Sequence, residues 1–294
     1  MTTAITKSPS RSSHAPLSRL TFGGILRSEW IKLWSLRSTF WCYLLIVVLN
    51  VGFAALIALN NLSGGDPTRG PARAAAGETG MAAAVTAVTL GINFTGLIAA
   101  VLGALMITGE YGTGMIKSTF TADPKRLGAF FGKAIVFGVV TFVLGFVSLI
   151  VSALAAAPLL SNNSKITLDW GNGHLWLALV GGAGYLALAG LIAYGFGAII
   201  RASAGGISAA IGLLFVVPIV MQVVSGLTQA KWAANVTQFL PSSAGGKMFA
   251  YGSGTSGVKD GLLTLDQTQG FLVLVAWVTV SLVVALILVK RRDA

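Results

Sequence analysis

Six long apolar stretches dominate the chain, and none of them contains Asp, Glu, Lys, Arg or His. Each is long enough to cross a bilayer core of about 30 Å as a helix that rises about 1.5 Å per residue. This pattern predicts an all-α polytopic membrane protein with six transmembrane helices. The stretches are Thr39–Leu59, Met81–Ile107, Ala134–Ala157, Leu175–Ile200, Ile207–Thr228 and Gly270–Val289.

The missing charges also limit how the protein could do work. A pump or carrier driven by an ion gradient normally keeps an ionisable side chain at membrane depth, where protons or cations bind. The six stretches keep none. If the protein moves a substrate, we therefore expect a partner to supply the energy. An ion-conducting pore is also disfavoured, because the sequence has no charged ring or filter segment.

Composition agrees with a membrane protein. Charged residues make up 10% of the chain and hydrophobic residues 55%, whereas a soluble domain carries about a quarter charged residues. The net charge of +11 could suggest nucleic acid, but basic residues that flank apolar spans first serve to orient them. Nucleic-acid binding would need a basic face on a soluble domain, and none is present. We expect the lipid bilayer, and not nucleic acid, as a partner.

The basic residues predict an orientation. Of the 20 lysines and arginines, fourteen fall on the same side of the six spans as the N-terminus and six fall on the other side. Positive charge concentrates on the cytoplasmic side of membrane proteins, so we predict both termini in the cytoplasm of a multi-pass protein of the cell (plasma) membrane. The six on the other side are Arg69, Arg73, Lys165, Lys231, Lys247 and Lys259.

The beginning of the chain differs from the rest. Residues 1–19 are rich in Ser, Thr and Pro and predict a disordered cytoplasmic tail. They lack the short apolar core and the small-residue cleavage site of a signal peptide. We expect the remaining residues, 20–294, to form one six-helix membrane domain.

A cationic amphipathic segment precedes the first apolar stretch. Between Leu20 and Phe40, apolar residues recur at helical spacing and alternate with basic ones, which is typical of a helix lying flat in the cytoplasmic headgroup layer. Trp30, Lys32 and Trp34 are its candidate interfacial residues. The helix could serve only as a topological anchor, or it could transmit the movement of a partner docked below.

The fifth stretch and the segment after it are irregular. Pro218 removes a backbone hydrogen bond and should kink its helix, and Gln222 follows one turn later. This pair could line a pathway, or it could be an ordinary irregularity of the bundle. The segment Leu227–Gln269 mixes apolar residues with Gly and Pro, and we expect one or two short helices at the outer mouth of the fifth and sixth spans.

Small residues crowd the fourth stretch and the segment after it. Such residues let helices approach closely in lipid, where van der Waals contact drives association. We favour packing within the chain over a dimer face. The residues are Gly181, Gly182, Gly184, Ala187, Ala189, Gly190, Gly195, Gly197, Gly205 and Gly206.

The segment between the second and third stretches, Thr108–Lys133, predicts a compact loop. Gly109 and Gly112 should interrupt the second span, and a short helix should follow from Thr113 to Phe120. Asp123 and Pro124 then form a helix start, since Asp accepts hydrogen bonds from free backbone amides and Pro suits the first helical position. A charged loop of two short helices is a surface that a separate soluble subunit could bind.

Catalytic motifs are missing, so we expect neither an enzyme nor a cofactor. A phosphate-binding loop needs Lys and then Ser or Thr directly after its last Gly, whereas Gly114 is followed by Met115 and Ile116. The two histidines form no zinc-binding pair, and no serine lies in a Gly-x-Ser-x-Gly elbow. The single cysteine, Cys42, excludes an intrachain disulfide. Any ATP must be hydrolysed elsewhere.

The same loop resembles a known family. Its residues follow the pattern Glu-Tyr-x-x-Gly, Pro-x-Arg, Gly-Lys, which is similar to the segment between the second and third spans of type-2 ABC export permeases. The segment Ser28–Leu33 is similar to the connecting helix of that family, and the span number agrees over nearly the whole chain. Met115 departs from the Thr often found after the Gly. The matching residues are Glu110, Tyr111, Gly114, Pro124, Arg126, Gly132 and Lys133.

This resemblance implies that residues 20–294 are the permease domain of a half-transporter. Two permeases, identical or paired with a sister permease, would work with two separate ABC ATPase subunits. The substrate, unidentified and amphipathic or drug-like, would leave the cell between the two permeases. The helix near Gly112–Phe120 would couple the permease to a cleft of the ATPase. The residues that this coupling implies are Glu110, Tyr111, Gly114, Met115, Lys117, Pro124 and Arg126.

A second class of function stays open. A membrane scaffold or immunity-type protein would recruit a partner through the same loop without transporting anything. A neighbouring gene that encodes a lone ATPase subunit would favour the transporter.

Overall fold

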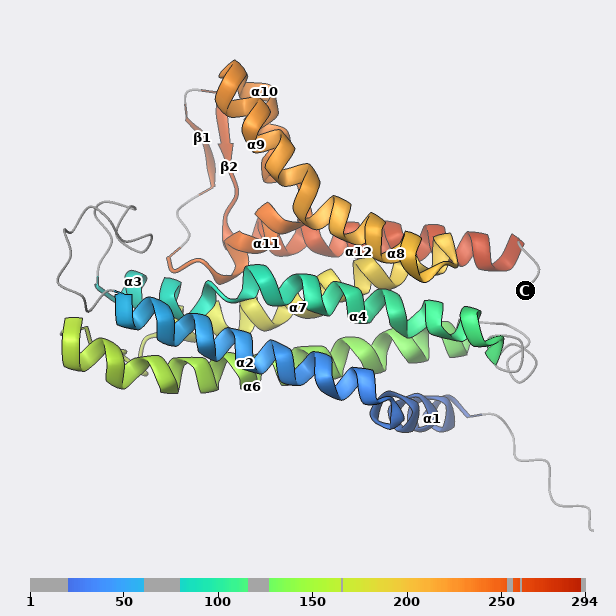
Figure 1. Ribbon diagram of the computed structural model, residues 1–294. Helices are drawn as coiled ribbons and strands as arrows, with labels where there is room; N and C mark the ends of the chain where they lie inside the picture. Colours follow the sequence, from blue (N-terminus) through green and yellow to red (C-terminus); the bar gives the residue numbers. More distant parts are fainter. Residues whose placement is uncertain are drawn as a thin grey trace, which may run out of the picture.

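The bundle has six spans. The structure is a computed structural model that describes residues 21–60, 80–115, 127–164, 166–252, 256–259 and 261–291. Within these residues six helical segments are long and apolar enough to cross a membrane, and Figure 1 shows them side by side in one bundle, except for the second half of the segment Ser203–Thr228. The prediction of an all-α polytopic fold with six spans is confirmed. The segments are Arg37–Leu59, Gly80–Thr113, Leu127–Asn162, Gly173–Ile200, Ser203–Thr228 and Gln267–Arg291.

Four of the spans are single helices. Because six is an even number, the first span begins and the last span ends at one end of the bundle, which we call the terminal end; the other is the far end (Figure 1). The predicted tail, residues 1–19, lies outside the described residues. The helices are α2 (Arg37–Asn60), α6 (Leu127–Ser164), α7 (Gly173–Ile200) and α12 (Gln267–Arg291).

Helix α6 is longer than its apolar stretch. It passes through Pro158 and ends at Ser164, so an end of the third span at Ala157 is wrong. The added turns bury Leu160 completely, and packing of this kind offsets the backbone hydrogen bond that a proline removes.

The second span consists of two helices, α3 (Gly80–Thr89) and α4 (Ile92–Thr113). The break lies at Leu90 and Gly91, while α4 continues through Gly109 and Gly112, so the prediction that these two glycines interrupt the span is wrong. A glycine in a helix costs only about 1 kcal/mol, which burial of Met106 and Ile107 on the same helix offsets.

Two hydrogen-bonded pairs of polar side chains join α2 to α6 in the interior. The hydroxyls of Tyr43 and Thr141 share a hydrogen bond of 2.8 Å, and Asn50 Nδ2 donates to Ser148 Oγ over 2.9 Å. Both pairs are separated by 98 positions in the sequence, so the two helices run parallel and in register. Asn50 Oδ1 also accepts from Thr95 of α4 over 3.1 Å.

The fifth span changes direction. It consists of α8 (Ser203–Ile211), a π-helical turn η1 (Gly212–Val216) and α9 (Val217–Thr228). A π-helical turn next to a proline is a known cause of bending, and Pro218 is the second residue of α9. Figure 1 shows α9 leaning away from the bundle, so the predicted kink is confirmed. No residue of α9 is buried.

Short elements follow the fifth span. The helices α10 (Lys231–Gln238) and α11 (Pro241–Phe249) confirm the prediction of one or two short helices. A hairpin of β1 (Gly257–Lys259) and β2 (Leu262–Thr264), antiparallel, was not predicted. Asn235 joins α10 to this hairpin, because its side chain donates to the Gly261 carbonyl over 3.0 Å and accepts from the Leu263 amide over 2.8 Å.

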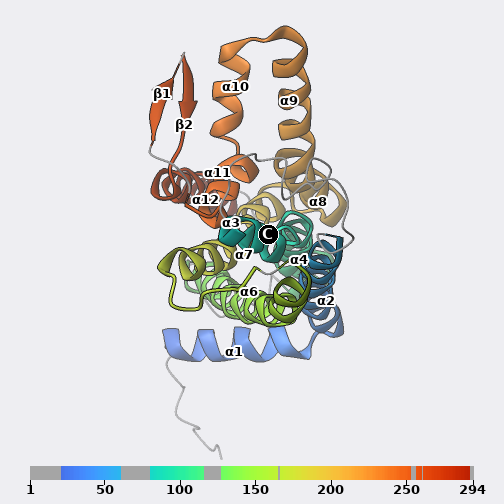
Figure 2. The same cartoon turned by 90° about the vertical axis from the view of Figure 1, so that its left-hand side faces the viewer.

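Helix α7 lies at the centre of the bundle (Figure 2) and has the largest buried share of the six spans. Its glycines allow close contact: a Cβ at Gly181 would overlap the Met248 carbonyl, and a Cβ at Gly103 of α4 would overlap the Gly190 carbonyl. The prediction that the small residues pack within the chain is therefore confirmed.

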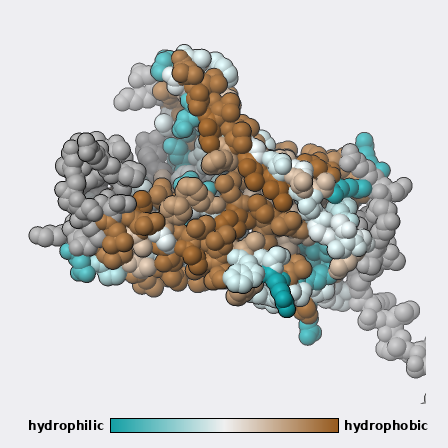
Figure 3. Space-filling model, in the orientation of Figure 1, coloured by the Kyte–Doolittle hydropathy of each residue, from teal (hydrophilic) through white to brown (hydrophobic). Residues whose placement is uncertain are grey.

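The surface agrees with a membrane location. Figure 3 shows a broad hydrophobic band over the middle of the bundle on this face, with hydrophilic residues toward the two ends. Such a band is what the hydrocarbon core of a bilayer requires.

Candidate functional site

Helix α1 (Phe22–Ser35) lies across the spans at the terminal end (Figure 2). Thr21 caps it, because its hydroxyl accepts a hydrogen bond from the Gly24 amide over 3.3 Å. Extended backbone at Leu36 separates α1 from α2, so the chain turns sharply between the two helices. This turn allows a helix to lie crosswise immediately before a span.

The two faces of α1 differ. Glu29 and Leu33 are buried, at 2% and 0% exposure, whereas Trp30 and Trp34 are 48% and 46% exposed. The two tryptophan rings contact each other, with centroids 6.0 Å apart. An exposed tryptophan pair suits a headgroup layer, but the location of α1 in that layer stays a prediction. Lys32 lies between the two faces, with 33% of its side chain exposed.

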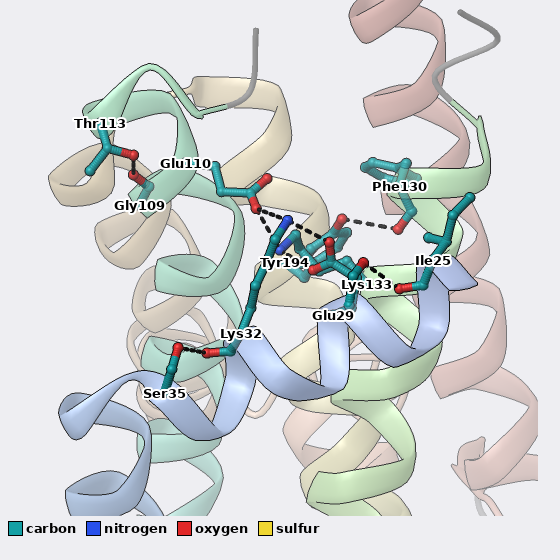
Figure 4. A network of polar contacts seen from close by, with 11 residues as sticks. Ile25, Glu29, Lys32, Ser35, Gly109, Glu110, Thr113, Phe130, Lys133 and Tyr194 are labelled. Carbon is teal, nitrogen blue, oxygen red and sulfur yellow. Dashed lines mark hydrogen bonds and ion pairs between the residues drawn. The ribbon is translucent and has the colours of Figure 1, made fainter. Parts of the chain in front are cut away.

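Four charged side chains form a network between α1, α4 and α6 (Figure 4). Lys133 of α6 lies 2.5 Å from Glu29 Oε2 and 2.9 Å from Glu110 Oε1 of α4. Lys32 lies 2.8 Å from Glu29 Oε1 and 3.3 Å from Glu110 Oε1. Two carboxylates and two ammonium groups therefore balance each other, and each lysine bridges both carboxylates.

The network is largely removed from solvent. The side chains of Glu29, Lys133 and Glu110 are 2%, 5% and 9% exposed. Buried charges need paired and hydrogen-bonded partners, and removing one partner costs roughly 3–5 kcal/mol. The Tyr194 hydroxyl of α7 donates to the Phe130 carbonyl over 3.1 Å beside the network. The terminal ends of α1, α4 and α6 are thus held together electrostatically.

Lys32 lies outside the spans, and its surroundings change the pKa of its amine. Burial by itself lowers the pKa of its amine, but the hydrogen bond to Glu29 and the negative charges of Glu110 and Glu29 outweigh that effect. The net result is a pKa above the ordinary value of 10.5. The amine therefore stays charged across the physiological range.

Gly132 explains how α1 approaches α6. A Cβ at this position would lie 2.8 Å from Cγ2 of Ile25 on α1, which is closer than side chains normally pack. The Gly-Lys pair of the loop motif thus has two local tasks. Gly132 lets α1 cross α6 closely, and Lys133 then reaches Glu29.

The structure places the residues of the predicted coupling segment in different environments. Glu110 belongs to the network, and Tyr111 packs under the Arg201 guanidinium, 5.2 Å from the ring centroid. Gly114 ends α4 in the left-handed conformation, with φ 72°, and Met115 is 46% exposed. Outside the described residues lie Lys117, Pro124 and Arg126, the short helix up to Phe120 and the predicted helix start.

Two network residues were not among the predicted site residues. Glu29 lies three positions after Leu26 and four before Leu33, so a carboxylate stands on the apolar face of an amphipathic helix. That mismatch is a signal of a buried partner. Lys133 comes directly before the third apolar stretch, where an orienting role was the simpler interpretation.

The predicted pathway residues lie away from the network. Pro218 is partly exposed and Gln222 is exposed on α9, so within one chain they line no enclosed channel. Within the described ranges, no group of three or more His, Cys, Asp or Glu side chains is placed to hold a metal ion.

Comparison with known proteins identifies the family. A sequence model described as ABC-2 family transporter protein matches residues 24–294, which covers α1 from Gly24 onward, all six spans and the loop between the second and third spans. A search of curated proteins finds no match. The chain therefore belongs to the ABC-2 transporter family and is a type-2 ABC transporter permease, a multi-pass membrane protein.

Proposed function

We propose that the chain is the membrane subunit of an ATP-driven exporter in the plasma membrane. A separate ATPase subunit hydrolyses ATP, and a second copy or a sister permease completes the transporter. The observation that carries this proposal is the buried ion network, because it joins α1 to the two helices that flank residues 116–126. With both termini in the cytoplasm, this terminal end faces the ATPase.

The network supports a mechanical role for α1. Helix α4 leads into residues 116–126 and α6 leads out of them, and Glu110 and Lys133 pair next to that segment. A force on the segment therefore reaches both spans and, through Glu29, the crosswise helix. Between an anchor and a transmitting element, the geometry favours transmission, because an anchor needs no buried ionic bond to the spans.

The coupling residues divide into two roles in this proposal. Glu110 is buried and holds the ends of the helices together, and Tyr111 packs against Arg201. Gly114 ends α4, and the exposed Met115 follows as the first candidate for direct contact with the ATPase. Lys117, Pro124 and Arg126 complete the predicted contact segment.

The substrate is expected to be amphipathic or drug-like. The apolar stretches offer no charged group to a simple ion, and apolar walls suit molecules with a large apolar surface. Helix α9 leaves Gln222 exposed. If two permeases meet along α9, Pro218 and Gln222 would line the pathway between them.

The test uses proteoliposomes that contain the permease and the ATPase subunit recovered with the tagged permease from native membranes. We expect ATP-dependent efflux of at least one dye from a panel of amphipathic fluorescent dyes. The double substitution Glu29→Gln with Lys133→Gln should reduce that efflux roughly tenfold, a typical size for the coupling between two sites. The exposed Lys290→Gln on α12 is the matched control and should leave efflux unchanged.

Three outcomes would contradict the proposal. Efflux driven by an ion gradient in vesicles without the ATPase would show that no ATPase is needed. A recovered ATPase that binds the permease and moves none of the dyes would favour a scaffold. Full efflux in the double variant would remove the network from the coupling mechanism.

A further inference from the structure

An open groove of about 310 Å³ lies where α1 meets α6. Its volume falls at the lower end of the range for small-molecule sites. Three residues of each helix line it, and their spacing of three and four positions places each set on one face of its helix. The lining residues are Leu26, Arg27 and Trp30 of α1 and Ile135, Val136 and Val139 of α6.

The groove leads from the contact of the two helices into the third span. Helix α1 passes α6 at Gly132, where an added Cβ would lie 2.8 Å from Cγ2 of Ile25. Val139 follows seven residues later, about 10 Å farther along the axis, within the uncharged stretch Ala134–Ala157. The side chains of Ile135 and Val139 are 45% and 55% exposed. An exposed apolar wall inside a span faces the hydrocarbon chains of a bilayer.

Arg27 is the charged residue of this lining. Its side chain is exposed, and among the residues that the structure describes it forms no ion pair, because the four ion pairs there all lie within the network between α1, α4 and α6. The carboxylates of that network are already balanced by lysines. A guanidinium that keeps its charge beside an apolar groove suits a phosphate, which it can bind through two parallel hydrogen bonds.

Trp30 adds a third property to the groove. Its ring is 48% exposed, and tryptophan is enriched where the hydrocarbon core meets the headgroups. The groove therefore combines a cation for a phosphate, an aromatic ring suited to the interface and an apolar wall for an acyl chain. This combination matches a phospholipid.

The charge of Arg27 selects among phospholipids. A zwitterionic headgroup carries its own cation next to the phosphate, whereas an anionic lipid with an alcohol headgroup keeps a net negative charge that a basic side chain can balance. We propose that the groove binds one anionic phospholipid, with its phosphate at Arg27 and one acyl chain along Ile135 and Val139. The site belongs to the permease alone. Its test needs no ATPase, so a failure here is distinguishable from a failure of ATP-driven transport.

The probe is a phosphatidylglycerol with a photoreactive diazirine in one acyl chain, added to the purified permease in detergent micelles. After irradiation, mass spectrometry locates the labelled peptides, which we expect on α1 around Leu26 and on α6 around Ile135. Unlabelled phosphatidylglycerol should compete roughly fivefold better than phosphatidylcholine with the same chains, on the order expected for one basic side chain beside an anionic lipid. Glycerol phosphate, which has the charge and no chains, should not compete.

One pair of variants tests the charge. Arg27→Gln should abolish the fivefold preference, so that the two lipids compete equally. Arg37→Gln is the matched control, because it removes the same charge from an exposed position at the start of α2 that does not line the groove. The preference should remain in this control.

A second pair tests the apolar wall. A long side chain on a helix covers the turn that precedes it, so the ring in Val139→Trp would lie over Ile135 and fill the groove. Labelling of α1 should then be lost. Val147→Trp is the matched control, because Val147 is 48% exposed on the same helix and does not line the groove. Labelling of α1 should remain in this variant.

Each result supports or overturns the site. Loss of the preference in Arg27→Gln together with its retention in Arg37→Gln supports it. A preference that both variants lose, or that both keep, overturns it, because the attraction would then not come from the groove. Competition by glycerol phosphate overturns it as well, since a soluble phosphate would suffice. Equal labelling of α1 in the two tryptophan variants would show that no acyl chain occupies the groove.

Discussion

Lys133 and Glu29 form a buried ion pair of 2.5 Å although 104 positions separate them in the sequence. The pair joins a crosswise helix to a span, and Glu110 and Lys32 extend it to a third helix. An ion pair at this depth has consequences for stability, for packing and for the response to pH.

Removing Lys133 alone should be more damaging than removing the whole pair. Lys133→Gln leaves two buried carboxylates with one ammonium group, at a cost of roughly 3–5 kcal/mol. Adding Glu29→Gln restores the charge balance, so the double variant should be more stable than Lys133→Gln. Thermal unfolding of the purified permease measures this. The exposed Lys290→Gln should change nothing, and additive costs of the two single substitutions would contradict the pairing.

Gly132→Ala should displace α1 from α6. The added Cβ would lie 2.8 Å from Cγ2 of Ile25, and we expect the helices to move apart because the χ1 angle of a β-branched residue in a helix is restricted. A second substitution, Ile25→Ala, removes the contacted atom and should restore the wild-type position. Spin-label distances between α1 and α6 measure the displacement. Gly109→Ala meets nothing within 4 Å and serves as control; an unchanged distance in Gly132→Ala would contradict the close crossing.

Gly91→Ala should destabilise the bundle by more than 1 kcal/mol, on the order expected for overpacking. Its Cβ would lie 2.6 Å from Asn50 Oδ1 and 2.9 Å from Asn50 Cα. Because the second contact is to backbone, Asn50→Ala should not rescue it. Gly52→Ala, with nothing within 4 Å, should be neutral or stabilising. Thermal unfolding in detergent compares the variants, and rescue by Asn50→Ala would contradict the backbone contact.

The contribution of Lys32 should persist to high pH. Its pKa in the folded protein lies above 10.5, so the stabilisation is complete below the ordinary value and is lost as pH rises through the folded value. The spin-label distance between α1 and α6 should therefore stay constant from about pH 6 to about pH 9 and change only under strongly alkaline conditions. A change near neutrality would show that another group controls the docking of α1.

Much of the fold could be predicted because membrane insertion depends on local composition. The uncharged apolar stretches predicted the six spans. Pro218 predicted the bend, and the mixed segment after Leu227 predicted the short helices α10 and α11. The break at Gly91 could not be predicted in the same way. Gly91 lies against Asn50, which approaches from another helix, and a single sequence does not show that contact.

The ion network could not be predicted for the same reason, because its partners come from different helices. Glu110 stands out in the sequence as a motif residue, but its partners come from positions 78 residues before it and 23 after it. A single sequence shows the sign of a charge and not its neighbour. The lysines were therefore counted as orienting charges, although Lys133 and Lys32 also balance two buried carboxylates.

The two hydrogen-bonded pairs between α2 and α6 restrict how these helices can move. Tyr43 with Thr141 and Asn50 with Ser148 lie seven residues apart on each helix, which is about 10 Å along the axis. Sliding one helix past the other breaks both pairs at once, and neither can re-form at an intermediate offset. The first and third spans therefore move as one rigid unit. This unit can tilt or rotate, but its two helices do not slide along each other.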